Sequence, residues 1–165
     1  MSDQTAQLEV LIDDRDLRVR TLGRVAVMVW HATPRRAAIE ALRAKVTPHH
    51  ERYADGVALV VAARGGPPDD EARTAFREMV RSVEKSIAGV AVLVGVRGFR
   101  GAVVRGAVSA AVLALGLPFG VKVLDSPATI GDHVDRLLRD RRLDSPGARS
   151  IERALAAIES PVTAA

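Results

Sequence analysis

Arginine and glycine residues gather where two strongly apolar segments of the sequence end. They are Arg64, Gly65 and Gly66 after segment 56–63, and Arg97, Gly98 and Arg100 after segment 90–96. Guanidinium groups bind carboxylates and phosphates through paired hydrogen bonds, and glycine lets the backbone approach an anion closely. Arg105 follows in the next apolar segment, where a charged side chain needs an edge, a ligand or an acidic partner. These residues are a candidate site for a small anionic ligand, the alternative being tight turns flanked by solvated arginines.

The sequence contains no complete catalytic signature. It has no cysteine, which excludes thiolate chemistry and cysteine-bound metals. A phosphate-binding loop ending in Gly-Lys-Ser/Thr is absent, and the spacing of Gly95, Gly98 and Gly101 departs from the G-x-G-x-x-G order of dinucleotide sites. We therefore expect no catalytic residue, no cofactor and no metal ion, and we favour a protein that is not an enzyme.

Histidine is the remaining residue type that could carry chemistry at neutral pH. His31 follows the strand predicted at 25–30 and is the candidate functional histidine, the alternative being a hydrogen-bonded structural role. His49 and His50 follow Pro48 in what the pattern predicts to be a polar connection. We expect these two side chains to be exposed and not to bind a metal ion.

The size and charge of the chain limit the classes of protein to which it can belong. Its 165 residues suffice for one domain, placed at 8–142, with a polar tail at 1–7 and a linker with a short helix at 143–165. The net charge of +4 comes from arginines interleaved with acidic residues, which is typical of a solvated surface and disfavours nucleic acid as a partner. The longest uncharged run, 106–121, has 16 residues, whereas a membrane-spanning helix needs about 20. The N-terminus lacks the pattern of a signal peptide, so a cytoplasmic location is expected.

Strand patterns alternate with helical patterns along most of the chain. Apolar runs predict strands at 8–12, 17–22, 25–30, 56–63, 90–96 and 119–124. Helical spacing predicts helices from Thr33-Pro34 to just before Pro48, and at 69–86, 99–115, 126–142 and 149–159. Strands that are joined through helices pair in parallel and are covered on both faces. The predicted fold is a single-domain α/β fold: a mixed sheet with an N-terminal β-hairpin, mostly parallel core strands and helices packed on the sheet.

The element order, the strand ends VALVVAAR and VAVLVGVRGF, and the apolar segment leading into FGVKVLDSP together resemble the STAS domain, the SpoIIAA-like fold of bacterial anti-sigma-factor antagonists. The resemblance covers roughly residues 8–142. Switching members of that family carry an Asp-Ser-Ser/Thr-Gly motif whose serine is phosphorylated. The matching place here reads Ala63-Arg64-Gly65-Gly66, without a hydroxyl. The resemblance therefore implies a STAS-like module that lacks the phospho-switch.

Two functions follow from these observations. The resemblance implies a bacterial, cytoplasmic regulatory module that binds a protein partner or a second copy of itself and does no catalysis. The apolar helix expected around 107–117 and the neighbouring strand-end loops would form its contact surface. The alternative is a protein or enzyme that binds a small anionic ligand through the arginine cluster at the strand ends.

Overall fold

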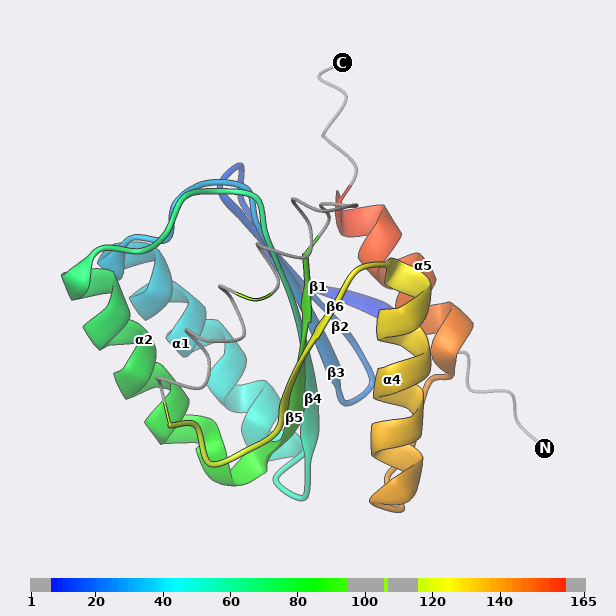
Figure 1. The fold of residues 1–165 in the computed structure, drawn as a ribbon. Helices are drawn as coiled ribbons and strands as arrows, with labels where there is room; N and C mark the ends of the chain where they lie inside the picture. Colours follow the sequence, from blue (N-terminus) through cyan, green and yellow to red (C-terminus); the bar gives the residue numbers. More distant parts are fainter. Residues whose placement is uncertain (1–6, 95–105, 107–115, 160–165) are drawn as a thin grey trace.

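A six-stranded sheet forms the centre of the protein, and its strands lie side by side in chain order (Figure 1). The computed structural model describes residues 7–94, 106 and 116–159. The strands are β1 (Leu8–Asp13), β2 (Leu17–Leu22), β3 (Val25–Trp30), β4 (Val57–Ala63), β5 (Ile87–Leu93) and β6 (Val121–Leu124). β1, β2 and β3 are antiparallel neighbours, whereas β3, β4, β5 and β6 run parallel. The mixed, mostly parallel sheet with an N-terminal hairpin is confirmed.

Helices cover both faces of this sheet (Figure 1). α1 (Arg36–Arg52) and α2 (Asp70–Val83) lie on one face, and a short 3-10 turn (Glu84–Ser86) joins α2 to β5. α4 (Pro127–Asp140) and α5 (Ala148–Glu159) lie on the other face, where α5 contacts β2 and β3. The predicted α/β class is therefore confirmed.

Each central strand contributes to two apolar cores because its side chains alternate between the faces of the sheet. Val27 and Val29 of β3 pack in the core beneath α4 and α5. Met28 and Trp30, the residues between and after them, pack in the core beneath α1 and α2. All of these side chains are buried, as expected for a strand in the middle of a sheet covered on both sides.

The first helix begins later than the sequence predicts. Its N-cap is Arg35, which makes no side-chain capping hydrogen bond, so Thr33-Pro34 does not start the helix. The Thr33 hydroxyl instead accepts a hydrogen bond from the backbone N–H of Gly66 at 3.0 Å. The Thr33 oxygen that was expected to cap the helix therefore binds the loop after β4 instead.

The same helix ends later than predicted, because it continues through Pro48 to Arg52. Proline removes one helical hydrogen bond and normally ends or bends a helix. Here the turns on either side carry Val46, His49 and His50, all of which are buried. Burial of these side chains offsets the missing bond, and the expectation that the two histidines are exposed is wrong.

The other predicted elements are found with small shifts in their bounds. β5 begins at Ile87 rather than at residue 90, because Ile87 and Gly89 already pair with β4. α2 begins after Asp69, whose side chain accepts a hydrogen bond from Ala72 N, and α4 begins at a capping box formed by Ser126 and Thr129. The helix predicted at 99–115 lies outside the described residues apart from Gly106, which is helical.

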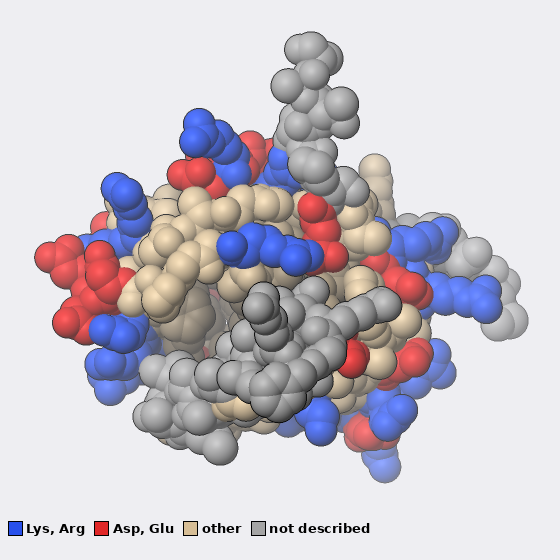
Figure 2. Space-filling model, turned by 45° about the horizontal axis from the view of Figure 1, so that its top comes forward, with Lys and Arg blue, Asp and Glu red and all other residues tan. Residues whose placement is uncertain are grey.

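Within the described ranges 7–94 and 116–159, each helix is too short or too polar to cross a lipid bilayer. Basic and acidic side chains are interspersed on the face shown in Figure 2. This distribution agrees with the solvated charged surface expected from the sequence.

Candidate functional site

The side chain of Arg64, the residue after β4, contacts the helix α5. Its Nη2 forms an ion pair with Oε1 of Glu159, the last residue of α5. The side chain of Arg64 is 45% exposed and that of Glu159 is 16% exposed, so the pair lies at the surface. The backbone N–H of Arg64 also donates to the carbonyl of Trp30 at 2.7 Å. Arg64 therefore fixes the end of the sheet to α5, and an anionic ligand would have to displace Glu159.

Gly65 and Gly66 fasten this loop to the loop after β3. A Cβ on Gly65 would overlap the backbone of Ala32 and Thr33, so only glycine fits there without movement. Gly66 donates its N–H to the Thr33 hydroxyl. The two glycines thus have a structural explanation in the close approach of two loops. The other members of the predicted cluster, Arg97, Gly98, Arg100 and Arg105, lie outside the described residues.

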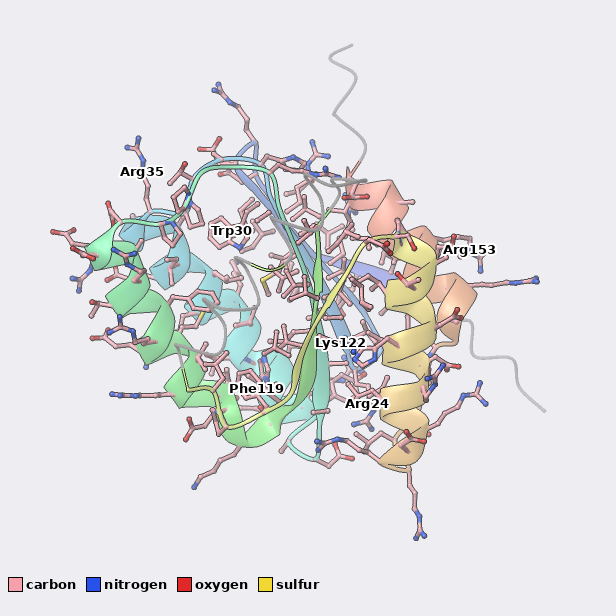
Figure 3. All side chains as sticks on the ribbon, in the orientation of Figure 1. Arg24, Trp30, Arg35, Phe119, Lys122 and Arg153 are labelled. Carbon is pink, nitrogen blue, oxygen red and sulfur yellow. The ribbon has the colours of Figure 1, made fainter. Side chains whose placement is uncertain are left out.

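His31 lies in the same region, and its backbone N–H donates to the carbonyl of Asp16 at 2.8 Å. Its Nε2 is buried without a hydrogen-bond partner among the residues that the structure describes. A neighbouring hollow of about 520 Å³ is lined by Arg15, Asp16, Trp30, Ala32, Thr33, Arg35 and Ala38. Figure 3 shows that Arg35 points away from the body of the protein. This hollow is open and polar, and its lining does not include Arg64.

A second hollow, which we call the apolar hollow, lies between the sheet and the helices α1 and α2. Its volume is about 150 Å³. Figure 3 shows Phe119, one of its lining residues, on the side of the sheet that carries these helices. The described residues that line it are Met28, Leu42, Val46, His50, Leu59, Val61, Phe76, Met79, Val80, Val83, Ile87, Val90, Val92, Leu117, Phe119 and Val121. Within this described lining, His50 is the one residue with a polar side chain.

His50 is held in place by a buried hydrogen bond to Ser86. The Nδ1 atom of His50 lies 2.7 Å from Ser86 Oγ, and Ser86 Oγ donates to the carbonyl of Val83 at 2.9 Å. Only 4% of His50 is exposed. Burial, followed by the neighbouring charge of His49, lowers the pKa of His50 to about 4. The ring is therefore neutral at physiological pH.

A separate polar hollow lies on the other side of this histidine. It has a volume of about 440 Å³ and is lined by Thr47, His50, Glu51, Ala54, Arg81, Ser82, Val83, Lys85 and Ser86. His50 and Val83 line both hollows, so they form part of the wall between a wet, charged surface and the apolar interior.

The sequence contains a signal for the burial of His50. Ile39, Leu42, Val46 and His49 recur at intervals of three and four residues, and His50 lies four residues after Val46. This spacing continues the buried face of the helix through Pro48. Pro48 hides this signal, because proline is typical of the end of a helix and predicts a loop for the two histidines that follow it.

No group of three or more metal-binding side chains occurs in residues 7–94 and 116–159. The chain matches no family model, no curated protein and no solved structure.

Proposed function

We propose that this chain is a non-enzymatic binding module of STAS-like type without a phospho-switch, and that the apolar hollow is its binding site. The single observation that supports the proposal is the hollow itself. On the opposite face, α4 and α5 close over the sheet with Ile130, Leu138, Ile151 and Leu155 fully buried. On the α1/α2 face, the described residues leave a space of about 150 Å³ between apolar walls.

An empty apolar space is unfavourable. Cavities reduce stability by roughly 24 cal/mol per Å³, so a hollow of about 150 Å³ costs on the order of 4 kcal/mol when nothing fills it. An apolar group that enters the hollow regains contacts and leaves water, which is worth about 25 cal/mol per Å² of apolar surface buried. The hollow therefore favours the binding of an apolar group.

The resemblance supplies the rest of the proposal. A regulatory module of this kind works in the bacterial cytoplasm. A protein partner, or a second copy of the chain, would bind differently to the module when the hollow is occupied and when it is empty. The phosphorylatable serine of switching STAS domains is replaced by the glycines after Arg64, so a bound molecule takes over the role of the phosphate.

The proposal is tested by comparing toluene binding to the parent with toluene binding to a variant in which a larger side chain fills the hollow. Val61 of β4 lines the hollow and is only partly buried, so Val61→Phe fills the space with little disturbance of the fully buried core. Val10 is 50% exposed in β1 and away from the hollow, which makes Val10→Phe the matched control. Toluene should shift the methyl signals of Met28 and Met79 in the parent and in Val10→Phe, but not in Val61→Phe. The proposal fails if toluene leaves these signals unchanged in the parent.

The anion-binding alternative has one observation in its favour. The open hollow near His31 is lined by Arg15 and Arg35 beside the start of α1, a helix with no acidic residue in its first turn. Positive side chains and free N–H groups at a helix start attract anions. Titration with inorganic phosphate, followed through the amide signals of residues 31–38, tests this second candidate. Arg35→Gln should abolish any shift there.

A further inference from the structure

We propose that the last turn of α1 and the residue after it, residues 48–53, form an acid-sensitive latch, which is closed while His49 and His50 are neutral and opens when their rings bind protons. This inference goes beyond the proposed function and does not depend on the apolar hollow. It is carried by two adjacent histidines that are buried where the helix is interrupted by Pro48. Opening of the latch releases the end of α1 from the turn between α2 and β5 and leaves the sheet intact.

The backbone of α1 is weakened at the start of the latch. Pro48 has no N–H, so the helical hydrogen bond from residue 48 to the carbonyl of Ala44 is missing. The carbonyl of Arg43, one residue earlier, accepts a hydrogen bond from the Thr47 hydroxyl at 2.7 Å. A side-chain bond of this type slightly destabilises a helix and often bends it. The last turn therefore depends on the contacts of its side chains with other elements.

His50 joins the latch to the turn between α2 and β5. Its Nδ1 lies 2.7 Å from Ser86 Oγ, and Ser86 Oγ donates its own proton to the carbonyl of Val83. A serine hydroxyl has one proton, so Nδ1 donates in this contact and the neutral ring has its lone pair on Nε2. Protonation of Nε2 keeps the bond to Ser86 but places a positive charge on a buried side chain. The charge therefore favours the open latch, in which water solvates the ring.

His49 forms the other contact of the latch. Its ring packs against the ring of Tyr53, with 5.0 Å between the two centroids. The guanidinium groups of Arg24 and Arg52 lie 5.2 and 5.5 Å from the centre of the same Tyr53 ring. Nε2 of His49 is buried and has no hydrogen-bond partner among the described residues. The centroids of the two histidine rings are 6.3 Å apart, so protonation of both rings also brings like charges together.

The charges around the two rings do not offset the cost of burying a proton. Burial lowers the pKa of His49, and Glu9 of β1, which raises it, and Arg52, which lowers it, have smaller effects. Burial, followed by the charge of His49, lowers the pKa of His50 to about 4. The charged groups around His50 at the polar hollow are Glu51, Arg81 and Lys85. The latch is therefore most stable above pH 6.5 and weakens as the pH falls toward 4.

Amide hydrogen exchange in the parent protein tests the latch without a variant that could fail to fold. The Tyr53 amide donates to the carbonyl of His49 at 3.1 Å and reports on the latch, whereas the Val60 amide in β4 reports on the sheet. From pH 7 to pH 4.5, the protection of the Tyr53 amide, corrected for intrinsic exchange, should fall roughly 50-fold. At pH 4.5 it should be at least about tenfold lower than the protection of the Val60 amide.

Urea distinguishes opening of the latch from unfolding of the whole protein. Low concentrations of urea should reduce the protection of the Val60 amide, whose exchange requires exposure of the core, and should leave that of the Tyr53 amide nearly unchanged. Equal protection of the two amides with the same urea dependence would overturn the inference. Protection of the Tyr53 amide that is the same at both pH values would also overturn it.

His50→Gln separates the titration of the ring from its hydrogen bond. A glutamine side chain can donate to Ser86 but does not titrate, so the fall in Tyr53 protection should shrink from roughly 50-fold to less than about tenfold. His133→Gln is the matched control, because burial also lowers the pKa of His133, which lies in α4 on the other face of the sheet. This control should show the same fall as the parent. An undiminished fall in His50→Gln would overturn the inference.

Discussion

Gly131 of α4 lies directly against Ala148, the first residue of α5, so closely that a Cβ on Gly131 would overlap the Ala148 carbonyl group. The two helices can approach because this position has no side chain. Ser145 supports the same junction through a hydrogen bond from its hydroxyl to Asp135 of α4. The docking of α5 on the sheet therefore depends on a glycine in its neighbour.

Gly131→Ala is expected to lower the free energy of unfolding by about 1–3 kcal/mol, because the added methyl group forces the helices apart. Gly120→Ala is the matched control, since nothing lies within 4 Å of a Cβ at that position. The control should stay within about 1 kcal/mol of the parent. Urea unfolding of the three proteins measures the difference, and equal stabilities would contradict the close approach of α4 and α5.

Arg24 is a buried arginine that holds three loops together. Its side chain is 8% exposed, and its Nη1 donates to Asp55 Oδ1 at 3.0 Å and to the carbonyl of Gly56 at 2.8 Å. Its Nη2 lies 3.9 Å from Asp144, and its guanidinium lies 5.2 Å from the centre of the Tyr53 ring. These contacts connect the β2–β3 turn to the loop before β4 and to the loop after α4.

Arg24→Ala should lower stability by about 1–3 kcal/mol, because it leaves the carbonyl of Gly56 without its buried hydrogen-bond donor, whereas the exposed carboxylates of Asp55 and Asp144 remain solvated. Arg15→Ala, at a side chain that is 97% exposed, should change stability by less than about 0.5 kcal/mol. The hydrogen bond from Arg24 holds the pKa of Asp55 below its ordinary value, so that pKa should rise in Arg24→Ala. An NMR titration in which the Asp55 pKa stays unchanged would show that the contact is not formed in solution.

The pKa of His50 makes the stability of the protein depend on pH. Its folded-state pKa of about 4 lies below the ordinary value of 6.5, so the unfolded chain binds the proton more readily. The stabilisation is complete above pH 6.5 and is lost as the pH falls toward 4, up to about 3 kcal/mol. Burial also lowers the pKa values of His49 and His133, and both act in the same direction.

Unfolding free energies at pH 7 and pH 4.5 measure this dependence. The charged groups near His50 are His49 on its own helix, and Glu51, Arg81 and Lys85 around the polar hollow. These groups remain in His50→Leu, so the variant isolates the titration of one ring. We expect the loss of stability between the two pH values to be smaller in His50→Leu than in the parent. The same loss in both would assign the pH dependence to other groups.

The ion pair between Arg64 and Glu159 should contribute little to stability, because both ends reach the surface. A double-mutant cycle with Arg64→Gln and Glu159→Gln is expected to give a coupling energy of about 0.2–1 kcal/mol. The coupling should fall in high salt. A coupling energy of zero would contradict a stabilising contact between Arg64 and Glu159.

Local patterns in the sequence were enough to predict most of the fold. Alternation in 17–22, the apolar run 25–30 and the Ser126 cap each depend on neighbouring residues, and all three are found where they were expected. The predicted end of α1 before Pro48 is wrong because the hydrogen bond that proline removes is a local property. The burial of His50 that offsets this loss depends on Ser86, 36 positions away in the sequence. The start of β5 is missed for a similar reason: Ile87 falls between the helix predicted at 69–86 and the strand predicted at 90–96, and its pairing with the distant Val57 places it in β5.

The candidate site was harder to predict for the same reason. Arg64 follows a strand, as the sequence predicts, but its partner Glu159 is 95 positions away in the sequence, in the helix α5 that packs on β2 and β3. The apolar hollow is a space left where α1 and α2 meet β4, β5 and β6, and no spacing rule describes such a space. Residue types can indicate chemistry, whereas an unfilled volume appears only when the elements are assembled.

The agreement between strand order and chain order has a consequence for how the protein is made. Each strand pairs with the one synthesised just before it, so the sheet can grow outward from the N-terminal hairpin while the chain is still emerging from the ribosome. Among the described elements, α5 departs from this order, because it is made after all six strands and covers β2 and β3. Until it arrives, one apolar face of the oldest strands is bare. A chain arrested before Ala148 should therefore be the form that chaperones bind most strongly.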